Sequence, residues 1–395
     1  KGLQNNTVLT SFIDNKNNIW LGLDNGIDFI NENSTLTYFG YSYGISTVYA
    51  SVVFNGNLYV ATNQGVFYSK WKLPFREESF SLLEGTTGQA WNIQVIDGQL
   101  ICGNNNGALL IEGNHFVKTL DTRGYFRFKK IPSHPNYIIG ANYNGFAVFE
   151  KTANGLTYRN QIVGFEKPSI SFEIDKSYLW LKKDDLIYQM SISDDLKKFN
   201  TIKTYPNLSD DNKGIGSIQT VNNTVYFQTN NHFYKYSQDQ DLFYEDKKMS
   251  ELFKSLPKIY SLTQDSFGNI WYLFNESLGV LSKKSSGEYR NIVAPFSNLT
   301  GNLVNNYISV NTIDPKNIFI GLTDGLAHYD SQFSNNSSSK PTAFIRSLSF
   351  PGDMLMFGNG QNTLEKQKIP YKSNRVKFTF SSPSYENIDN IEFSH

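Results

Sequence analysis

The chain has 395 residues, with 36 basic and 36 acidic side chains, so its formal net charge is zero. Aromatic residues make up 15% of the chain and charged residues 18%. A neutral chain lacks the basic surface that nucleic-acid binding or attachment to anionic membranes requires. The length and the aromatic content are sufficient for a large buried core, which excludes disorder as the main description.

Residue types that hold metals and cofactors are scarce. Cys102 is the only cysteine, so neither an internal disulfide nor a zinc site made of several cysteines can form. The five histidines are dispersed and show no metal-binding spacing. We therefore expect no metal and no cofactor.

The sequence contains no obvious targeting or membrane segment. No stretch approaches the roughly 18 consecutive apolar residues that a membrane-spanning helix needs. No secretory signal is recognisable, and the chain begins at Lys1 rather than at a methionine. We expect a segment of a longer or processed protein, in which only absent flanking parts would contact a membrane.

An internal repeat organises most of the chain. Its first copy, DNKNNIWLGLDNGIDFI, occupies residues 14–30. Similar copies occupy residues 55–69, 97–111, 136–149, 175–190, 222–236, 265–281 and 314–329. Each copy consists of a turn, an apolar strand, a second turn and another strand, and Asn-Gly or Asp-Gly turns are typical of antiparallel hairpins.

The period of the repeat predicts the fold. Equivalent positions, such as Trp20, Tyr59 and Trp271, recur at an average spacing of about 43 residues. An apolar strand precedes each copy, and segments between copies, such as residues 31–39 and 237–244, supply an outermost strand. Four strands per period indicate an all-β protein, a β-propeller of four-stranded blades. We expect seven blades, or eight if the first copy joins the same ring.

The predicted domain boundaries follow from the repeat. Residues 1–35 are the last repeat of an upstream propeller, or else the first blade of the same ring. Residues 36–340 form the β-propeller, which ends in a polar linker. Residues 341–395 contain strand patterns without the repeat, including the alternation VKFTF, and are expected to form the start of an immunoglobulin-like β-sandwich.

The repeat resembles the two-component regulator propeller repeat, which has the signature D..G.IW.G...GL. The copies at 14–30, 265–281 and 314–329 carry it best. Residues 25–69 look like a junction between two propellers of such a sensor. Residues 369–395 resemble the start of the immunoglobulin-like domain, called Y_Y_Y, that follows these propellers.

This resemblance implies a function. Members of the family are hybrid two-component sensors of gut Bacteroidetes, with two periplasmic seven-bladed propellers, an immunoglobulin-like domain, one membrane helix and cytoplasmic kinase, receiver and DNA-binding parts. They detect oligosaccharides released from complex glycans and turn on genes for using the glycan. The resemblance thus implies a periplasmic, ligand-sensing segment of a histidine kinase, itself not an enzyme, that pairs as a homodimer.

A ligand would be expected at the mouth of the central channel, where the innermost strands begin. Aligning the strand starts places five side chains near one rim: Tyr49, Trp91, Arg127, Tyr260 and Tyr307. Aromatic faces with nearby amides suit a carbohydrate, and Arg127, with Lys129 and Lys130 close in sequence, suits an acidic sugar. The alternative is that these aromatic side chains only fill the channel or pack between blades.

Loops between the second and third strands are expected at the same face. They carry Asn63, Gln64, Asn104, Asn105, Asn142, Asn144, Asn230, Asn275 and Asp324. Asparagine in such loops has an alternative explanation, because its side chain favours turn conformations.

Catalytic residues are not indicated. Adjacent acids occur at 184–185, 194–195 and 210–211. Neighbouring carboxylates point to opposite faces of a strand, or are solvated in a turn, which disfavours glycosidase chemistry.

A sensor module is therefore the first hypothesis. The alternatives are a propeller-fold polysaccharide lyase or glycoside hydrolase, and a propeller that serves only for dimerisation.

Overall fold

The computed structural model describes residues 3–31, 34–75, 79–206, 217–304, 308–331, 343–350, 354–357, 371 and 375–382. Contacts divide the chain into two units, Lys1–Ser334 and Asn335–His395. Almost all regular structure is strand, so the predicted all-β class is confirmed.

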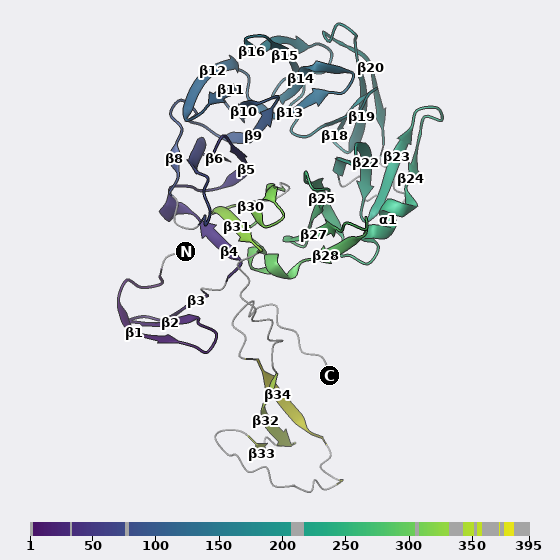
Figure 1. Cartoon of the computed structure of the whole chain (residues 1–395). Helices are drawn as coiled ribbons and strands as arrows, with labels where there is room; N and C mark the ends of the chain where they lie inside the picture. Colours follow the sequence, from purple (N-terminus) through teal and green to yellow (C-terminus); the bar gives the residue numbers. More distant parts are fainter. Residues whose placement is uncertain are drawn as a thin grey trace. The chain divides into compact units, whose positions relative to one another are not determined.

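Seven four-stranded antiparallel sheets make up most of the first unit, and they are arranged around a common centre (Figure 1). The strands of the first three are β5 (Val48–Phe54), β6 (Asn57–Thr62), β7 (Val66–Lys70) and β8 (Ser81–Leu82); β9 (Ala90–Ile96), β10 (Gln99–Asn104), β11 (Gly107–Glu112) and β12 (His115–Asp121); and β13 (Tyr125–Ile131), β14 (His134–Asn142), β15 (Gly145–Thr152) and β16 (Gly155–Ile162).

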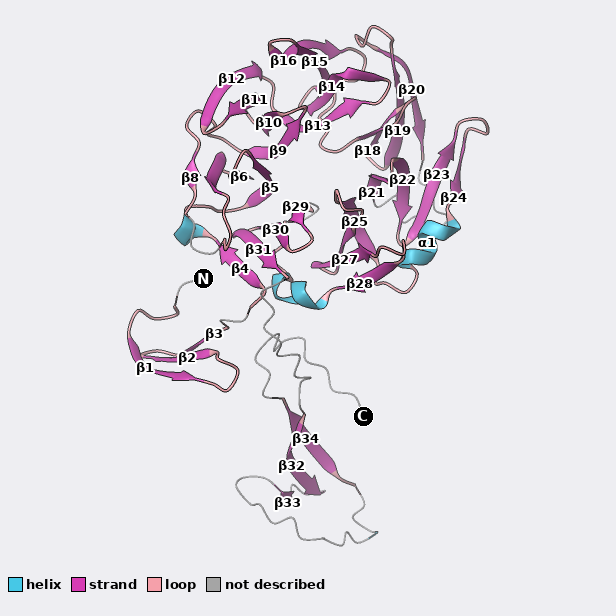
Figure 2. Ribbon diagram, viewed as in Figure 1, coloured by secondary structure: helices cyan, strands magenta, loops and turns pink. Residues whose placement is uncertain are grey.

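The next three sheets follow the same order. Their strands are β17 (Glu173–Ile174), β18 (Leu179–Lys183), β19 (Leu186–Ile192) and β20 (Phe199–Tyr205); β21 (Ser217–Val221), β22 (Thr224–Thr229), β23 (His232–Ser237) and β24 (Leu242–Glu245); and β25 (Ile259–Gln264), β26 (Ile270–Phe274), β27 (Ser277–Lys283) and β28 (Tyr289–Ile292). Three short helices connect strands, namely η1 (Tyr41–Tyr43), α1 (Lys247–Phe253) and η2 (Ala294–Leu299), coloured in Figure 2.

The seventh sheet joins the two ends of the ring. It contains β29 (Val310–Asp314), β30 (Asn317–Leu322) and β31 (Gly325–Asp330), and its outermost strand is β4 (Leu36–Phe39). The register pairs Leu326 with Phe39 and Tyr329 with Leu36. The sequence predicted an outermost strand within residues 31–39 and a propeller that begins at residue 36; the structure places this strand in the last sheet of the ring.

Hydrophobic contacts between the sheets follow the ring. Each of the seven buried clusters lies between two successive sheets, and one of them joins the last sheet to the first. In that closing cluster Phe39, Phe319 and Leu326 of the seventh sheet pack against Val48 and Leu58 of the first. Burial of apolar surface between every pair of neighbours stabilises the closed arrangement.

Hydrogen bonds made by an aspartate account for the matching Asp and Trp positions of the copies at 14–30 and 265–281. The Oδ1 atom of Asp14 accepts the backbone N–H of Asn18 at 3.0 Å, and its Oδ2 atom accepts from Nε1 of Trp20 at 3.1 Å. Asp265 accepts in the same way from Nε1 of Trp271, at 3.0 Å. Burial acts to raise the pKa of Asp14, but these hydrogen bonds outweigh it and lower the pKa to about 2.

The first repeat forms a sheet of its own within the described residues. It consists of β1 (Val8–Ile13), β2 (Ile19–Leu23) and β3 (Ile27–Ile30). None of its residues belongs to the seven buried clusters found in the described part of the chain. Leu9 and Phe12 are each 66% exposed, whereas the corresponding residues of the first ring sheet, Tyr49 and Val52, are half-buried.

The second unit contains a three-stranded sheet in the order β33-β32-β34, with β32 (Phe344–Phe350), β33 (Met354–Phe357) and β34 (Lys377–Ser381). β34 contains the alternating segment that the sequence indicated. The other strands expected for an immunoglobulin-like sandwich, near residues 364–371 and 388–394, lie outside the described residues apart from Tyr371.

Candidate functional site

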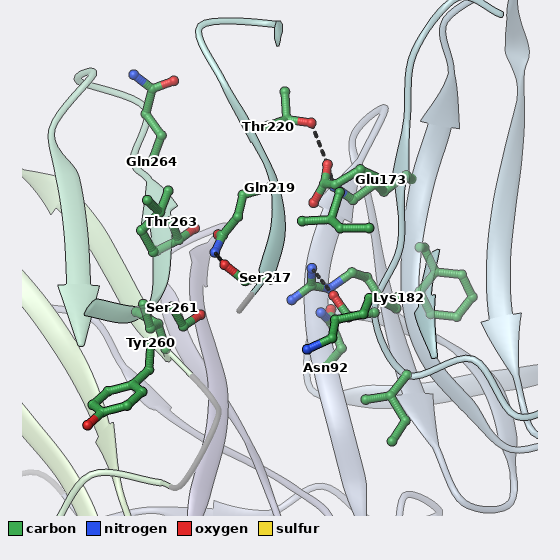
Figure 3. A pocket seen from close by; sticks show the side chains of 18 of the residues that line it. Asn92, Glu173, Lys182, Ser217, Gln219, Thr220, Tyr260, Ser261, Thr263 and Gln264 are labelled. Carbon is green, nitrogen blue, oxygen red and sulfur yellow. Dashed lines mark hydrogen bonds and ion pairs between the residues drawn. The ribbon is translucent and has the colours of Figure 1, made fainter. Parts of the chain in front are cut away.

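The innermost strands of five sheets enclose a cavity of about 700 Å³ at the centre of the ring (Figure 3). Small-molecule sites in proteins commonly have volumes of this order. Its lining is mainly polar and comprises Asn92, Gln94, Arg127, Phe128, Lys129, Ile170, Ser171, Glu173, Lys182, Ser217, Ile218, Gln219, Thr220, Tyr260, Ser261, Leu262, Thr263, Gln264 and Ile308.

The innermost strand of the fourth sheet, which forms one wall of the cavity, is shorter than the sequence indicated. An innermost strand was expected over residues 169–174, but β17 contains only Glu173 and Ile174, which pair with Trp180 and Leu179. The preceding segment instead bonds to the third sheet, through Ser169 N–H and the carbonyl of Asn142 at 3.2 Å. The end of β18 therefore lacks an inner strand partner in the described chain.

This gap leaves Lys182 as part of the cavity wall. The side chain comes from β18, a second strand, whereas most of the lining comes from first strands. In Figure 3 Lys182, Asn92 and Tyr260 lie toward one end of the cavity, and Glu173 and Thr220 lie toward the other.

Three cationic side chains and one carboxylate line the cavity. Glu173 is buried, and its Oε2 atom accepts from Nζ of Lys129 and from the hydroxyl of Thr220. Burial lowers the pKa of Lys129; the Glu173 charge opposes this shift, and the positive charge of Arg127 adds to it. Arg127 contacts Ser171, with Nη1 and Oγ 3.5 Å apart.

Amides and hydroxyls of the wall are linked to one another. Gln219 donates through Nε2 to Oγ of Ser217 at 2.6 Å, and Ser217 donates to Oε1 of Gln228 at 2.6 Å. Gln94 donates to the carbonyl oxygen of Phe128 at 3.2 Å. The Oδ1 atom of Asn92 is buried and has no hydrogen-bond partner among the described residues.

A row of aromatic rings runs across the first three sheets. Ring centroids are 5.2 Å apart for Tyr49 and Trp91, 5.7 Å for Trp91 and Phe126, and 4.7 Å for Phe126 and Tyr143. The Oδ1 atom of Asn105 accepts from Nε1 of Trp91 and from the hydroxyl of Tyr143, each at 2.8 Å. These contacts hold the rings in defined positions. We call Tyr49, Trp91, Phe126 and Tyr143 the aromatic row.

The five predicted ligand-binding side chains fall into three groups. Tyr49 and Trp91 contact each other in the aromatic row. Arg127 and Tyr260 both line the central cavity. Tyr307 lies outside the described residues. The structure thus places four of the five on the inner strands.

Tyr260 also borders a second cavity, of about 620 Å³. Its walls include Leu273 and Glu276 of the sixth sheet and Thr323 of the seventh. Tyr260 is 48% exposed, and the ammonium group of Lys258 lies 5.9 Å from its ring centroid. Its ring is therefore accessible from the space between these two sheets.

Several side chains of the site were missed by sequence reasoning. Phe126 and Tyr143 complete the aromatic row, and Glu173 and Lys182 bring charge to the cavity. Phe126 begins the predicted strand that also contains Arg127. Since consecutive strand residues point to opposite faces, this alternation could have indicated that Phe126 and Arg127 serve different surfaces. Lys182 carries no such signal, because its position depends on the short β17.

Lys130 does not join the cavity that sequence proximity to Arg127 suggested. Its ammonium group instead pairs with Asp97, in the turn between β9 and β10. Lys129 and Lys130 are consecutive residues of one strand, so their side chains point to opposite faces.

Some of the loop asparagines have structural roles. Asn104 is fully buried and donates to the carbonyls of Thr86 and Gly88, at 3.1 and 3.2 Å. Asn142 is also fully buried and accepts the N–H of Asn144 at 2.8 Å. At these positions the turn-forming explanation accounts for the residue.

Two further kinds of feature are absent from the described residues. Within the described ranges, no group of three or more His, Cys, Asp or Glu side chains is placed to hold a metal ion. No helix in that same part of the chain is both long enough and apolar enough to cross a membrane.

Comparison with solved structures relates this fold to known proteins. No protein-family model matches the chain, and no curated protein matches it. The chain is similar to the extracellular domain assigned to hybrid two-component system BT3049 of B. thetaiotaomicron, with a TM-score of 0.63 and 16% identity, covering 96% of this chain and 53% of that domain. The domain assigned to system BT4673 of the same organism gives 0.51 and 15%, with coverages of 91% and 51%.

The chain therefore spans about half the length of these two extracellular domains. At this level of identity the likeness establishes the fold. The repeats resemble those of hybrid two-component sensors, and extracellular domains from two such systems are among the proteins that share this fold.

Proposed function

We propose that this chain is a periplasmic ligand-sensing segment of a hybrid two-component histidine kinase and binds an oligosaccharide released from a complex glycan. The fold it shares with extracellular domains of such systems supports the sensing role. The observations that support the ligand class are the aromatic row and the polar central cavity, whose lining includes Asn92 and Arg127, the sequence neighbours of Trp91 and Phe126. Aromatic faces pack on the C–H faces of sugars, and amides bond their hydroxyl groups.

The rigidity of the aromatic row favours binding. Tyr49 accepts a hydrogen bond from Nε2 of Gln89 at 2.9 Å, and Trp91 donates to Asn105. Rings that are already held in place lose little conformational freedom when a ligand arrives. The favourable energy of a sugar ring packing on Tyr49 and Trp91 would therefore be offset only slightly by a loss of side-chain entropy.

Replacing Trp91 or Tyr49 by alanine is expected to weaken oligosaccharide binding on the order of tenfold, because each ring offers a large preformed contact surface. Isothermal titration calorimetry against plant and host oligosaccharides would first identify the ligand, and the variants would then be titrated with it. Tyr244→Ala provides the control, since Tyr244 is an exposed tyrosine of outer strand β24. Unchanged affinity in Trp91→Ala, Tyr49→Ala and Tyr260→Ala would contradict an oligosaccharide-binding site at these side chains.

The alternative function, a propeller-fold lyase or glycoside hydrolase, is distinguished by the products. Incubation of the bound oligosaccharide with the protein, followed by chromatography, should return the ligand unchanged. Release of shorter or unsaturated products would identify an enzyme instead.

Signalling would require that the ligand changes how two copies pair. We propose that the segment forms a homodimer and that the C-terminal β unit transmits the change toward the membrane, where it turns on glycan-utilisation genes. A ligand shifts such an equilibrium only by binding one state more tightly. Small-angle scattering with and without ligand should therefore differ, and identical profiles at saturation would contradict this mechanism.

A further inference from the structure

The central cavity contains more positive charge than its own carboxylate can neutralise. Arg127, Lys129 and Lys182 line it together with Glu173. Glu173 is already engaged by Lys129. Neither Arg127 nor Lys182 forms an ion pair with any described residue, and Arg127 has only the 3.5 Å contact with Ser171.

Placing unpaired cations beside one another is unfavourable unless something compensates for it. Burial lowers the pKa of Lys129, and the positive charge of Arg127 on the same strand adds to this shift. Charges in a partly enclosed, low-dielectric space interact more strongly than charges at an open surface. An anion entering the cavity would relieve this repulsion and satisfy the donors of Arg127 and Lys182.

We propose that the central cavity binds the anionic group of an acidic saccharide, a carboxylate or a sulfate, through Arg127 and Lys182. The guanidinium group of Arg127 presents paired N–H donors that match either oxyanion, and Lys182 adds a point charge to the lining of the same cavity. This inference rests on the proposed function and specifies the class of its ligand.

The same arrangement disfavours uncharged sugars. A neutral oligosaccharide would displace water from Arg127 and Lys182 without neutralising either one, which costs binding energy. We therefore expect discrimination between acidic and neutral saccharides of the same length, and weaker binding of the acidic ones at high salt.

Calorimetry with the 395-residue chain tests the proposal with four probes: a trimer of galacturonic acid, galactose 6-sulfate, a neutral trimer of galactose, and inorganic sulfate. The first two distinguish a carboxylate from a sulfate as the recognised group. Arg127→Gln and Lys182→Gln are each expected to weaken binding of the preferred acidic probe on the order of 10- to 100-fold. Lys118→Gln, at an exposed position of outer strand β12, should leave it unchanged.

Thermal melting of each variant separates loss of binding from loss of folding, because a folded variant retains the cooperative transition of the parent chain. Binding of an acidic probe that falls in Arg127→Gln and Lys182→Gln, but not in Lys118→Gln, supports the proposal. Equal binding of acidic and neutral trimers, or acidic binding that neither substitution weakens, overturns it.

The outcomes also separate this inference from the proposed function. Neutral saccharide binding that depends on Trp91 but not on Arg127 would retain the saccharide sensor and overturn the anionic site. Binding of inorganic sulfate that depends on Arg127, without binding of any saccharide in the broad panel, would retain the anion site and contradict the saccharide sensor. Binding of none of the four probes at millimolar concentration would overturn the acidic-saccharide proposal.

Discussion

A chain that begins at Tyr41 is expected to lose at least about 5 kcal/mol of unfolding free energy, because it lacks β4. Leu36 and Phe39 are 5% and 1% exposed, and they complete buried clusters on the two faces of the seventh sheet. Their loss would open two packed interfaces and leave β31 as an unpaired edge, which also favours aggregation. Thermal melting should show a fall of roughly 10 °C or more.

A chain that begins at Ser34 is the matched control. It lacks β1, β2 and β3 but keeps β4, including the hydrogen bond from Asp330 N–H to the carbonyl of Thr35 at 2.9 Å. Its main melting transition should stay close to that of the whole chain. If both truncations destabilise the ring equally, the sheet of the first repeat supports the ring, and ring closure by β4 is not the decisive contribution.

Trp271→Ala is expected to destabilise the ring by about 3–5 kcal/mol. Trp271 is 1% exposed and belongs to the cluster between the sixth and seventh sheets, where its ring lies 5.3 Å from that of Phe296. Alanine would leave a cavity and remove the indole donor to Asp265. Chemical denaturation followed by circular dichroism would measure the change in unfolding free energy.

Trp20→Ala provides a control at the same position of the repeat. Trp20 makes the same bond to Asp14, yet it is half-buried and lies outside the seven buried clusters. We expect a change in the main unfolding transition below about 1 kcal/mol. A loss as large as that of Trp271→Ala would show that the first repeat packs into the ring.

Much of the fold was predictable because many of the interactions that form it join residues close in sequence. The Asp-to-Trp hydrogen bond joins residues six apart, and the turns between strands need only two or three suitable residues. Because similar turns and strands recur along the chain, the repeat predicted the four-stranded sheets of the ring. The pairing of β4 with β31 was not predictable, because it joins residues almost 300 positions apart through backbone groups that carry no sequence mark.

The candidate site was only partly predictable for a related reason. Tyr49 and Trp91 occupy equivalent positions of neighbouring copies, so their contact follows from the repeat. Lys182 enters the cavity because β17 is short, and Lys130 turns away to Asp97. Both outcomes depend on which backbone segments find partners in adjacent sheets.

The sequence alone therefore determined the all-β class, the repeating sheet and the two rings that begin the aromatic row. These features depend on alternation along strands, turn residues and side-chain bonds between near neighbours. Only the tertiary structure decided which strand closes the ring and which charges share the central cavity. Those features depend on packing and pairing between distant segments, whose free energies depend on the whole assembled core.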